Sequence, residues 1–250
     1  MIFRKKVVQN AHHAGHHHPN LNVPASHLPK FTEPNDFRAS MHWRIFRIMA
    51  EFTEGFEFIA NHRKSVTVFG SARTKPGEKW YEEARRFGKM LSDAGFAVVT
   101  GGGPGIMQGA NQGAHEAGGV SVGLNIQLPS EQRINPYVNR GHGFHYFFSR
   151  KVMLSYSAQA YVYFPGGFGT LDEMTEIVTL IQTKKIEEHI PVILVGKEFW
   201  GPFVNWVTED MLGKFNGIDP DDLKIFTIVD SAEEAMAIVR GSKSRNEFDR

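Results

Sequence analysis

Two glycine-rich segments of the sequence have the residue types that hold phosphate groups. They are residues 100–111 (TGGGPGIMQGAN) and residues 163–173 (YFPGGFGTLDE). Each follows a short apolar run and precedes a stretch with helical periodicity, so we expect each to form a turn between a strand and a helix. Glycine lets a ligand approach the backbone closely, and the free amides at a helix start carry partial positive charge. Both turns are therefore candidate anion-binding sites.

The first turn lacks the features of a dinucleotide-binding fold. Such a fold places Gly-x-Gly-x-x-Gly after its first strand and an acidic residue about twenty positions later. Here the glycines follow the second predicted strand, and the next strand ends at Asn125 without a carboxylate. Close packing of a helix on a strand also requires glycine, so packing is an alternative to ligand binding. The sequence contains no Walker motif Gly-x-x-x-x-Gly-Lys-Ser/Thr, which disfavours ATP hydrolysis on a P-loop.

In the second turn, the glycines leave backbone amides open, and Thr170 can cap the helix or bind a phosphate oxygen. Asp172 and Glu173 follow it. Acidic residues in the first turn stabilise any helix by roughly 0.3–1 kcal/mol. Alternatively, Glu173 points past the phosphate toward a sugar and stabilises an oxocarbenium ion, as carboxylates do in glycoside cleavage. The spacing alone leaves both interpretations open.

A pair of cations, Arg150 and Lys151, forms the third cluster at the predicted start of a helix. Positive charge there opposes the helix dipole, which suggests an anionic partner for Arg150. The alternative is a surface pair with solvated charges, and for Lys151 the sequence favours neither interpretation.

Apolar runs that alternate with helical patterns must position these clusters. The predicted strands are residues 66–69, 97–100, 120–124, 144–148, 161–164, 191–195 and 225–229. Strands without polar alternation, separated by helices, indicate a parallel sheet covered on both faces. The predicted fold class is α/β: a Rossmann-like, doubly wound parallel sheet of about seven strands. Such sheets bind ligands at the carboxyl ends of their strands, where both turns lie.

Residues 1–36 and 37–250 differ in character. The first segment has no apolar period and contains the histidines of residues 12–18, so we expect a disordered or loosely docked arm. Nothing fixes the geometry of these histidines, and we predict no metal site. Residues 37–250 are predicted to form a single nucleotide-binding domain. It opens with an amphipathic helix over residues 41–59, behind a candidate cap at Asn35 or Asp36.

Composition excludes several classes of protein. The 28 basic and 27 acidic residues give a formal net charge of +1, without the basic surplus of nucleic-acid or membrane-surface binders. No stretch approaches the roughly 18 consecutive apolar residues that span a bilayer, and the start lacks a signal-peptide core, so we expect a cytoplasmic protein. The absence of cysteine excludes disulfides, Cys-ligated zinc, iron–sulfur clusters and thiol nucleophiles.

Three blocks in this order, residues 101–107, 149–153 and 165–173, resemble the LOG ("Lonely Guy") family. Its members are cytokinin riboside 5'-monophosphate phosphoribohydrolases, related to AMP nucleosidases and formerly labelled lysine decarboxylases. The resemblance spans about residues 65–240. Residues 128–137 and 180–184 look like the longer, bacterial-type branch of the family.

The resemblance implies hydrolysis of the N-glycosidic bond of a purine nucleoside 5'-monophosphate, of the cytokinin type or AMP. The products are the free base and ribose 5-phosphate, and neither a metal nor an organic cofactor is required. Arg150 and Glu173 are the implied catalytic pair, although many relatives have a second glutamate where this chain has Asp172. The residues implied to bind substrate are Ser71, Gly102, Gly103, Gly105, Met107, Met153, Gly166, Gly167, Gly169 and Thr170. Relatives assemble as dimers or larger rings, so we expect a homo-oligomer, either a dimer or a hexamer.

Two other functions share parts of this pattern. Molybdenum-cofactor carrier proteins share the glycine-rich fold and bind a phosphorylated pterin without chemistry, but the pair of Arg150 and Glu173 argues against a carrier. The decarboxylase label would require pyridoxal phosphate on a lysine, for which Lys151 is the only candidate.

Overall fold

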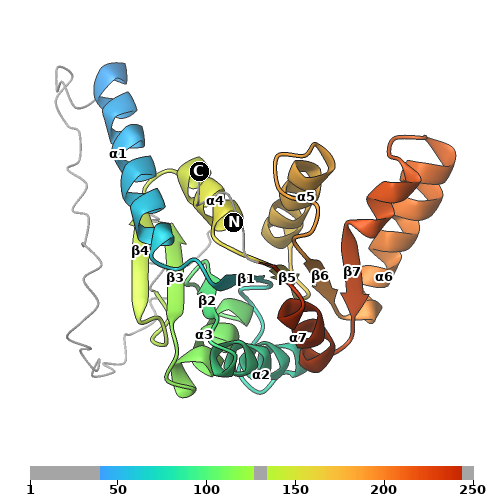
Figure 1. Ribbon diagram of the computed structural model, residues 1–250, viewed down its shortest axis with the longest axis horizontal. Helices are drawn as coiled ribbons and strands as arrows, with labels where there is room; N and C mark the ends of the chain where they lie inside the picture. The colour runs from blue at the N-terminus through green and yellow to red at the C-terminus, as the bar shows by residue number, and fades with distance from the viewer. Residues whose placement is uncertain (1–39, 127–133, 244–250) are drawn as a thin grey trace, which may run out of the picture.

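Seven parallel strands form the centre of the structure, a computed structural model that describes residues 40–126 and 134–243 (Figure 1). The strands are β1 (Ser65–Phe69), β2 (Ala97–Thr100), β3 (Ser121–Ile126), β4 (Arg140–Phe144), β5 (Tyr161–Tyr163), β6 (Val192–Val195) and β7 (Phe226–Val229). The α-helices are α1 (Met41–Ala60), α2 (Lys79–Asp93), α3 (Ile106–Glu116), α4 (Phe147–Tyr156), α5 (Phe168–Gln182), α6 (Lys197–Trp206) and α7 (Ala232–Arg240). A π-helical segment, η2 (Val207–Lys214), continues α6, and η3 (Pro220–Lys224) is a 3₁₀ helix. The predicted α/β class with a parallel sheet is confirmed.

The strand order β4-β3-β2-β1-β5-β6-β7 reverses between β1 and β5. The chain first proceeds outward from β1 to β4 and then returns to place β5 on the other side of β1. Open sheets of this kind leave a crevice at the carboxyl ends of the two central strands, where ligands bind. Phe69 and Tyr163 end these strands side by side, and their rings stack with centroids 4.8 Å apart.

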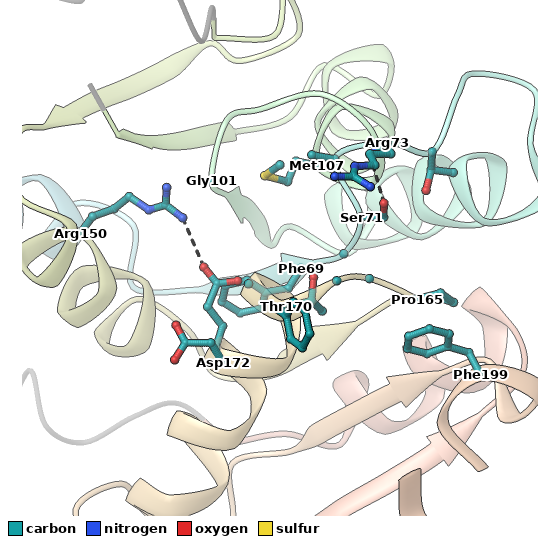
Figure 2. Close-up of a pocket in the computed structure, with 18 of the residues that line it drawn as sticks. Phe69, Ser71, Arg73, Gly101, Met107, Arg150, Pro165, Thr170, Asp172 and Phe199 are labelled. Carbon is teal, nitrogen blue, oxygen red and sulfur yellow. Dashed lines mark hydrogen bonds and ion pairs between the residues drawn. The ribbon is translucent and has the colours of Figure 1, made fainter. Parts of the chain in front are cut away.

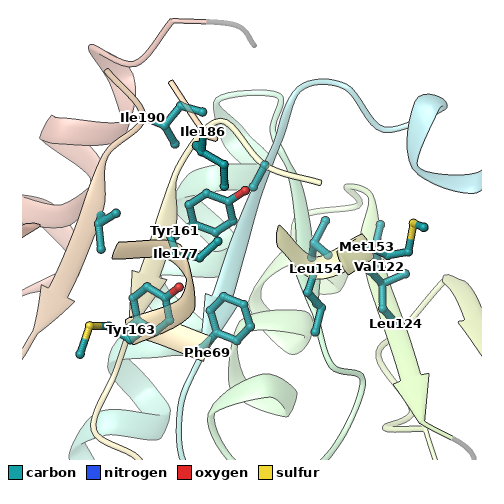
Figure 3. Packing of buried hydrophobic residues seen from close by; sticks show 14 of the residues in the cluster. Phe69, Val122, Leu124, Met153, Leu154, Tyr161, Tyr163, Ile177, Ile186 and Ile190 are labelled. Carbon is teal, nitrogen blue, oxygen red and sulfur yellow. The ribbon is translucent and has the colours of Figure 1, made fainter. Parts of the chain in front are cut away.

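Each face of the sheet has its own hydrophobic core, because side chains alternate along a strand. Val66 and Val68 of β1 belong to the core under α2, α3 and α7, whereas Phe69 belongs to the core under α1, α4, α5 and α6 (Figure 1). Figure 3 shows this second core, where Tyr161 and Tyr163 of β5 are buried. Burial on both faces explains why the inner strands are apolar without alternation.

The prediction of a strand at residues 144–148 is wrong. The strand there is β4, which ends at Phe144, and α4 begins at Phe147. β4 lies at the end of the sheet beside β3, so most of its residues are exposed or half-buried and its sequence, RGHGF, is polar. The apolar run belongs instead to the turn and to the first residues of α4, where Phe147 and Phe148 remain largely exposed.

The predicted N-terminal helix is present as α1, and its cap is Ser40. The Trp43 amide donates a hydrogen bond to Ser40 Oγ at 3.3 Å. The candidate caps Asn35 and Asp36, like the predicted arm, lie outside the described residues.

α1 packs along α4 (Figure 1). Gly55 allows this close contact, because a Cβ at that position would lie 2.9 Å from the Met153 side chain. Within the described ranges, no helix has both the length and the apolar character needed to cross a membrane.

Candidate active site

A cavity of about 910 Å³ opens beside the carboxyl ends of β1 and β5, where the strand order reverses (Figure 2). The loop after β1, the starts of α4 and α6, and the turn between β5 and α5 contribute most of its wall. The lining residues are Phe69, Gly70, Ser71, Ala72, Arg73, Thr74, Gly101, Met107, Phe147, Arg150, Pro165, Gly166, Gly167, Phe168, Gly169, Thr170, Asp172, Glu173 and Phe199.

Arg150 and Glu173 meet inside this cavity. A terminal guanidinium nitrogen of Arg150 donates to Glu173 Oε1 at 3.2 Å, and the two side chains are only 11% and 16% exposed. The guanidinium also lies over the Phe147 ring, 5.3 Å from its centroid. The Tyr163 hydroxyl donates to the backbone carbonyl of Glu173 at 3.2 Å. α4 therefore contacts the carboxylate of Glu173, and β5 contacts its backbone.

Burial shifts the pKa of both partners. It raises the pKa of Glu173 to about 7, although the positive charge of Arg150 partly lowers that pKa. Burial also lowers the pKa of Arg150, and Glu173 counteracts this effect. The Glu173 carboxyl thus titrates near neutral pH, a property common among acids and bases at catalytic sites.

The position of Glu173 on its helix bears on the two open interpretations of this carboxylate. α5 begins at Phe168 and has no acidic residue in its first turn, so Glu173 lies beyond that turn. First-turn stabilisation of a helix dipole therefore does not account for it.

The turn at residues 165–170 presents open amides at the start of α5. Gly167 is the N-cap and provides no side-chain cap, and first-turn amides have no acceptor within a helix. A Cβ at Gly167 or Gly169 would meet nothing within 4 Å, whereas a Cβ at Gly166 would overlap the Thr170 side chain. The open side of the turn can hold an anion the size of a phosphate.

The first glycine turn is instead used mainly for contacts within the protein. The Gly102 amide donates to Thr100 Oγ1 at 2.9 Å, and the Gly103 carbonyl accepts from Asn135 Nδ2 at 3.0 Å. Gly105 has a φ of +72°, and a Cβ there would overlap the backbone of the loop after β1. The structure does not bring these three glycines into the described cavity lining. Contacts within the protein account for the positions of these three glycines.

Three further predicted binding residues separate into two groups. Ser71 and Met107 line the cavity, and Ser71 Oγ accepts a hydrogen bond from the Arg73 amide at 3.1 Å. Met153 is fully buried in the core beside Gly55 of α1. Met153 lies on the same helix as Arg150, but its side chain belongs to the core and is not part of the described cavity lining.

The lining side chains that the sequence did not predict include Arg73, Phe147, Phe168 and Phe199. Arg73 lies across the cavity from Arg150 (Figure 2). Its place in the loop directly after β1 was the available signal, because ligands bind at strand ends. The phenylalanines gave no signal, since apolar residues in a sequence are more often part of a core. Phe168, at the tip of the second turn, is nevertheless 91% exposed.

Lys151 is not among the described lining residues and pairs with two carboxylates of α5. Its Nζ lies 2.8 Å from Asp172 and 3.4 Å from Glu176. Burial lowers the pKa of Lys151, but these two carboxylates together raise it above its ordinary value. A Schiff-base lysine must lose its proton within the site, and the described lining contains no lysine. The residues present therefore do not fit pyridoxal phosphate.

Clusters of three or more histidine or acidic side chains able to bind a metal are absent from the described part of the chain. The histidines of residues 12–18 lie outside that part.

The proteins that are similar to this chain include enzymes and a molybdenum cofactor carrier protein. Residues 107–239 match the family described as "Possible lysine decarboxylase". The chain is 28% identical over 177 residues to cytokinin riboside 5'-monophosphate phosphoribohydrolase LOG of Oryza sativa subsp. japonica, covering 69% of this chain and 70% of that protein. It is 26% identical over 182 residues to the cytokinin riboside 5'-monophosphate phosphoribohydrolase of Rhodococcoides fascians, covering 71% and 89%. The molybdenum cofactor carrier protein of Chlamydomonas reinhardtii has the same fold, with a TM-score of 0.54, 23% identity and coverage of 71% and 96%.

Proposed function

The chain belongs to the LOG family, described as "Possible lysine decarboxylase", and we propose that it is a nucleoside 5'-monophosphate phosphoribohydrolase. The reaction is hydrolysis of the N-glycosidic bond of a purine nucleotide, AMP or a cytokinin-type relative. One observation carries the proposal: a buried carboxylate, Glu173, shares a cavity with an open helix start that fits a phosphate.

The phosphate and the ribose of a nucleotide each match one part of this cavity, the start of α5 and the carboxylate of Glu173. The 5'-phosphate binds the amides of residues 167–170, and Thr170 Oγ1 adds a hydroxyl contact. Glu173 lies on the same helix one turn further on, so a ribose extending from the phosphate passes beside its carboxylate. Binding energy from the phosphate, remote from the bond that breaks, then serves to orient and distort the sugar.

Glu173 acts as the carboxylate in the chemical step. As the bond between the anomeric carbon and the base nitrogen breaks, positive charge develops on the sugar, and the carboxylate stabilises it. Water adds its oxygen to the anomeric carbon, and the departing base gains a proton. Arg150 holds Glu173 at 3.2 Å and favours its charged form. The aromatic wall of Phe147, Phe168 and Phe199 offers apolar area for the base.

Product chromatography after incubation with AMP and with isopentenyladenosine monophosphate tests this function. Free base and ribose 5-phosphate in equal amounts are expected from at least one of them. Adenosine is the matched control, because it lacks only the phosphate and is expected to react far more slowly. If no nucleoside monophosphate releases its base, the proposal is wrong.

The same preparation distinguishes a carrier from an enzyme. Pterin fluorescence in the purified protein, together with intact nucleotides after incubation, would favour a phosphorylated-pterin carrier. We expect cleavage without bound pterin.

A further inference from the structure

α4, the helix that carries Arg150, lacks a cap of its own. Its N-cap residue, Tyr146, makes no side-chain cap hydrogen bond, and the first turn contains no acidic residue. Arg150 and Lys151 add positive charge near the positive end of the helix dipole. The start of α4 therefore needs a negative charge from another element.

Glu51 of α1 provides that charge. Its Oε1 accepts from the His145 amide at 2.7 Å, and its Oε2 accepts from the Tyr146 amide at 3.2 Å. The Ser149 hydroxyl also donates to Oε2, at 2.6 Å. One carboxylate thus satisfies two backbone amides and a hydroxyl, as a cap residue within the helix would. α1 lies outside residues 107–239, the part that matches the family.

From this geometry we propose that Glu51 is a positioning residue for the active site, which fixes the start of α4 and so keeps Arg150 against Glu173. This inference rests on the proposed function. The Arg150 amide donates to the Tyr146 carbonyl at 3.3 Å, so the turn that Glu51 caps is the turn that holds Arg150. The phosphate-binding turn lies on α5, which Glu51 does not contact in the described structure.

Loss of this cap has a consequence that ordinary destabilisation lacks. The charged groups that affect Glu173 are Arg150 and Lys151 of α4, which lower its pKa, and Asp172 of α5, which raises it. When Arg150 recedes, the pKa of Glu173 rises. The acidic limb of the kcat/KM profile then moves to higher pH, because catalysis uses the carboxylate. A variant that only contains less folded protein has a lower kcat/KM at every pH, but the acidic limb of its profile stays at the same pH.

The test compares Glu51→Gln with Glu57→Gln, an exposed glutamate on the same helix. Glu51→Gln removes the charge and one acceptor. We expect kcat on AMP to fall about 10- to 100-fold, since small misplacements of catalytic groups have effects of this order. We expect KM to change less than about threefold, because the phosphate contacts remain. The acidic limb should move to higher pH in Glu51→Gln and stay in place in Glu57→Gln.

Two further variants keep the test decisive if Glu51→Gln folds poorly. Glu51→Asp retains the charge and is expected to recover part of the lost kcat. Ser149→Ala removes one donor to Glu51 and is expected to shift the limb in the same direction by a smaller amount. Wild-type kcat in Glu51→Gln, or a lower kcat with an unmoved limb, would overturn the proposal.

Hydrogen exchange separates failure of this inference from failure of the proposed function. In Glu51→Gln, amides in a peptide covering residues 145–156 should exchange faster than in wild type and in Glu57→Gln. Unchanged exchange would overturn the role of Glu51 whatever reaction the wild type catalyses. A wild type that cleaves no nucleotide would contradict the function alone.

Discussion

At the scale of single residues, the carboxyl group of Glu173 is buried at a cost in free energy. The pKa of Glu173 near 7 shows that its surroundings disfavour the charged form, although Arg150 compensates in part. Proteins retain such groups where chemistry requires them, at a cost in stability. Stability and activity should therefore depend on Glu173 in opposite directions.

We predict that Glu173→Gln becomes more stable relative to wild type as the pH rises. The folded pKa of about 7 lies above the ordinary value of 4.5, so between these values the folded protein binds more protons than the unfolded chain. The stability that wild type has below pH 4.5 is then lost as the pH rises through 7. Glutamine does not titrate. Calorimetry at pH 5 and pH 8 should show the Tm difference, variant minus wild type, increasing; a constant difference would argue against the raised pKa.

A second prediction concerns the turn at residues 165–170, which we propose to bind the phosphate. Gly167 has φ −97° and ψ −160°, which alanine adopts readily, and a Cβ there meets nothing in the protein. Gly167→Ala should therefore fold normally but obstruct the phosphate, raising KM for AMP about tenfold or more. Gly201→Ala on α6, where a Cβ also meets nothing, is the matched control and should leave KM unchanged. Equal KM values for both variants and wild type would place the phosphate elsewhere.

Residue types in the sequence indicate part of the candidate site, and the residues that they do not indicate were missed for physical reasons. The second turn could be expected at the cavity because glycine at a strand–helix junction is typical of anion-binding sites. For Glu173 the residue types left two interpretations open, and the resemblance to the LOG family implied its pairing with Arg150. For Arg73 the available signal was its place in the loop directly after β1, since a single surface arginine is ordinary in sequence. Met153 shows the reverse error: it lies within a motif, but its helix turns it toward α1.

At the scale of elements, the inner strands were predictable because both of their faces are buried. β4 was not, because an edge strand with glycine and histidine has no apolar run. The role of α1 in positioning α4 could not be predicted from the sequence either. Its apolar period predicted a helix, but the contact of Glu51 with the start of α4 depends on how two distant segments pack.

The α1–α4 contact gives a prediction at this scale. Gly55→Leu should force α1 away from Met153 and Phe144, which lie within 3.1 Å of a Cβ at that position. Overpacking of this kind costs about 1–3 kcal/mol. Thermal unfolding should show a lower Tm than for Gly201→Leu, a glycine replacement in a helix with free space around it. Equal Tm values would mean that α1 docks more loosely than the structure indicates.

At the scale of the whole molecule, α1 presents apolar side chains that the described chain leaves uncovered. Met41, Ile45, Phe46 and Met49 are each about half exposed or more. Exposed apolar patches of this kind mark contact surfaces, and we predict a homo-oligomer. Light scattering at micromolar concentration should give a mass above that of one chain, and Phe46→Glu should reduce it. A monomeric mass for wild type would refute this prediction.

We propose that the buried carboxylate of Glu173 drives glycosidic cleavage, and turnover by variants that lack one carboxylate tests this role. Turnover of AMP and isopentenyladenosine monophosphate is measured for wild type, Glu173→Gln and Glu176→Gln, a control one turn along α5 that pairs with Lys151 outside the cavity. Glu173→Gln removes the charge but keeps the shape of the side chain, so kcat should fall on the order of 10²–10³-fold or more while nucleotide still binds. Glu176→Gln should retain kcat. Full turnover by Glu173→Gln on every nucleotide that wild type cleaves would contradict the mechanism.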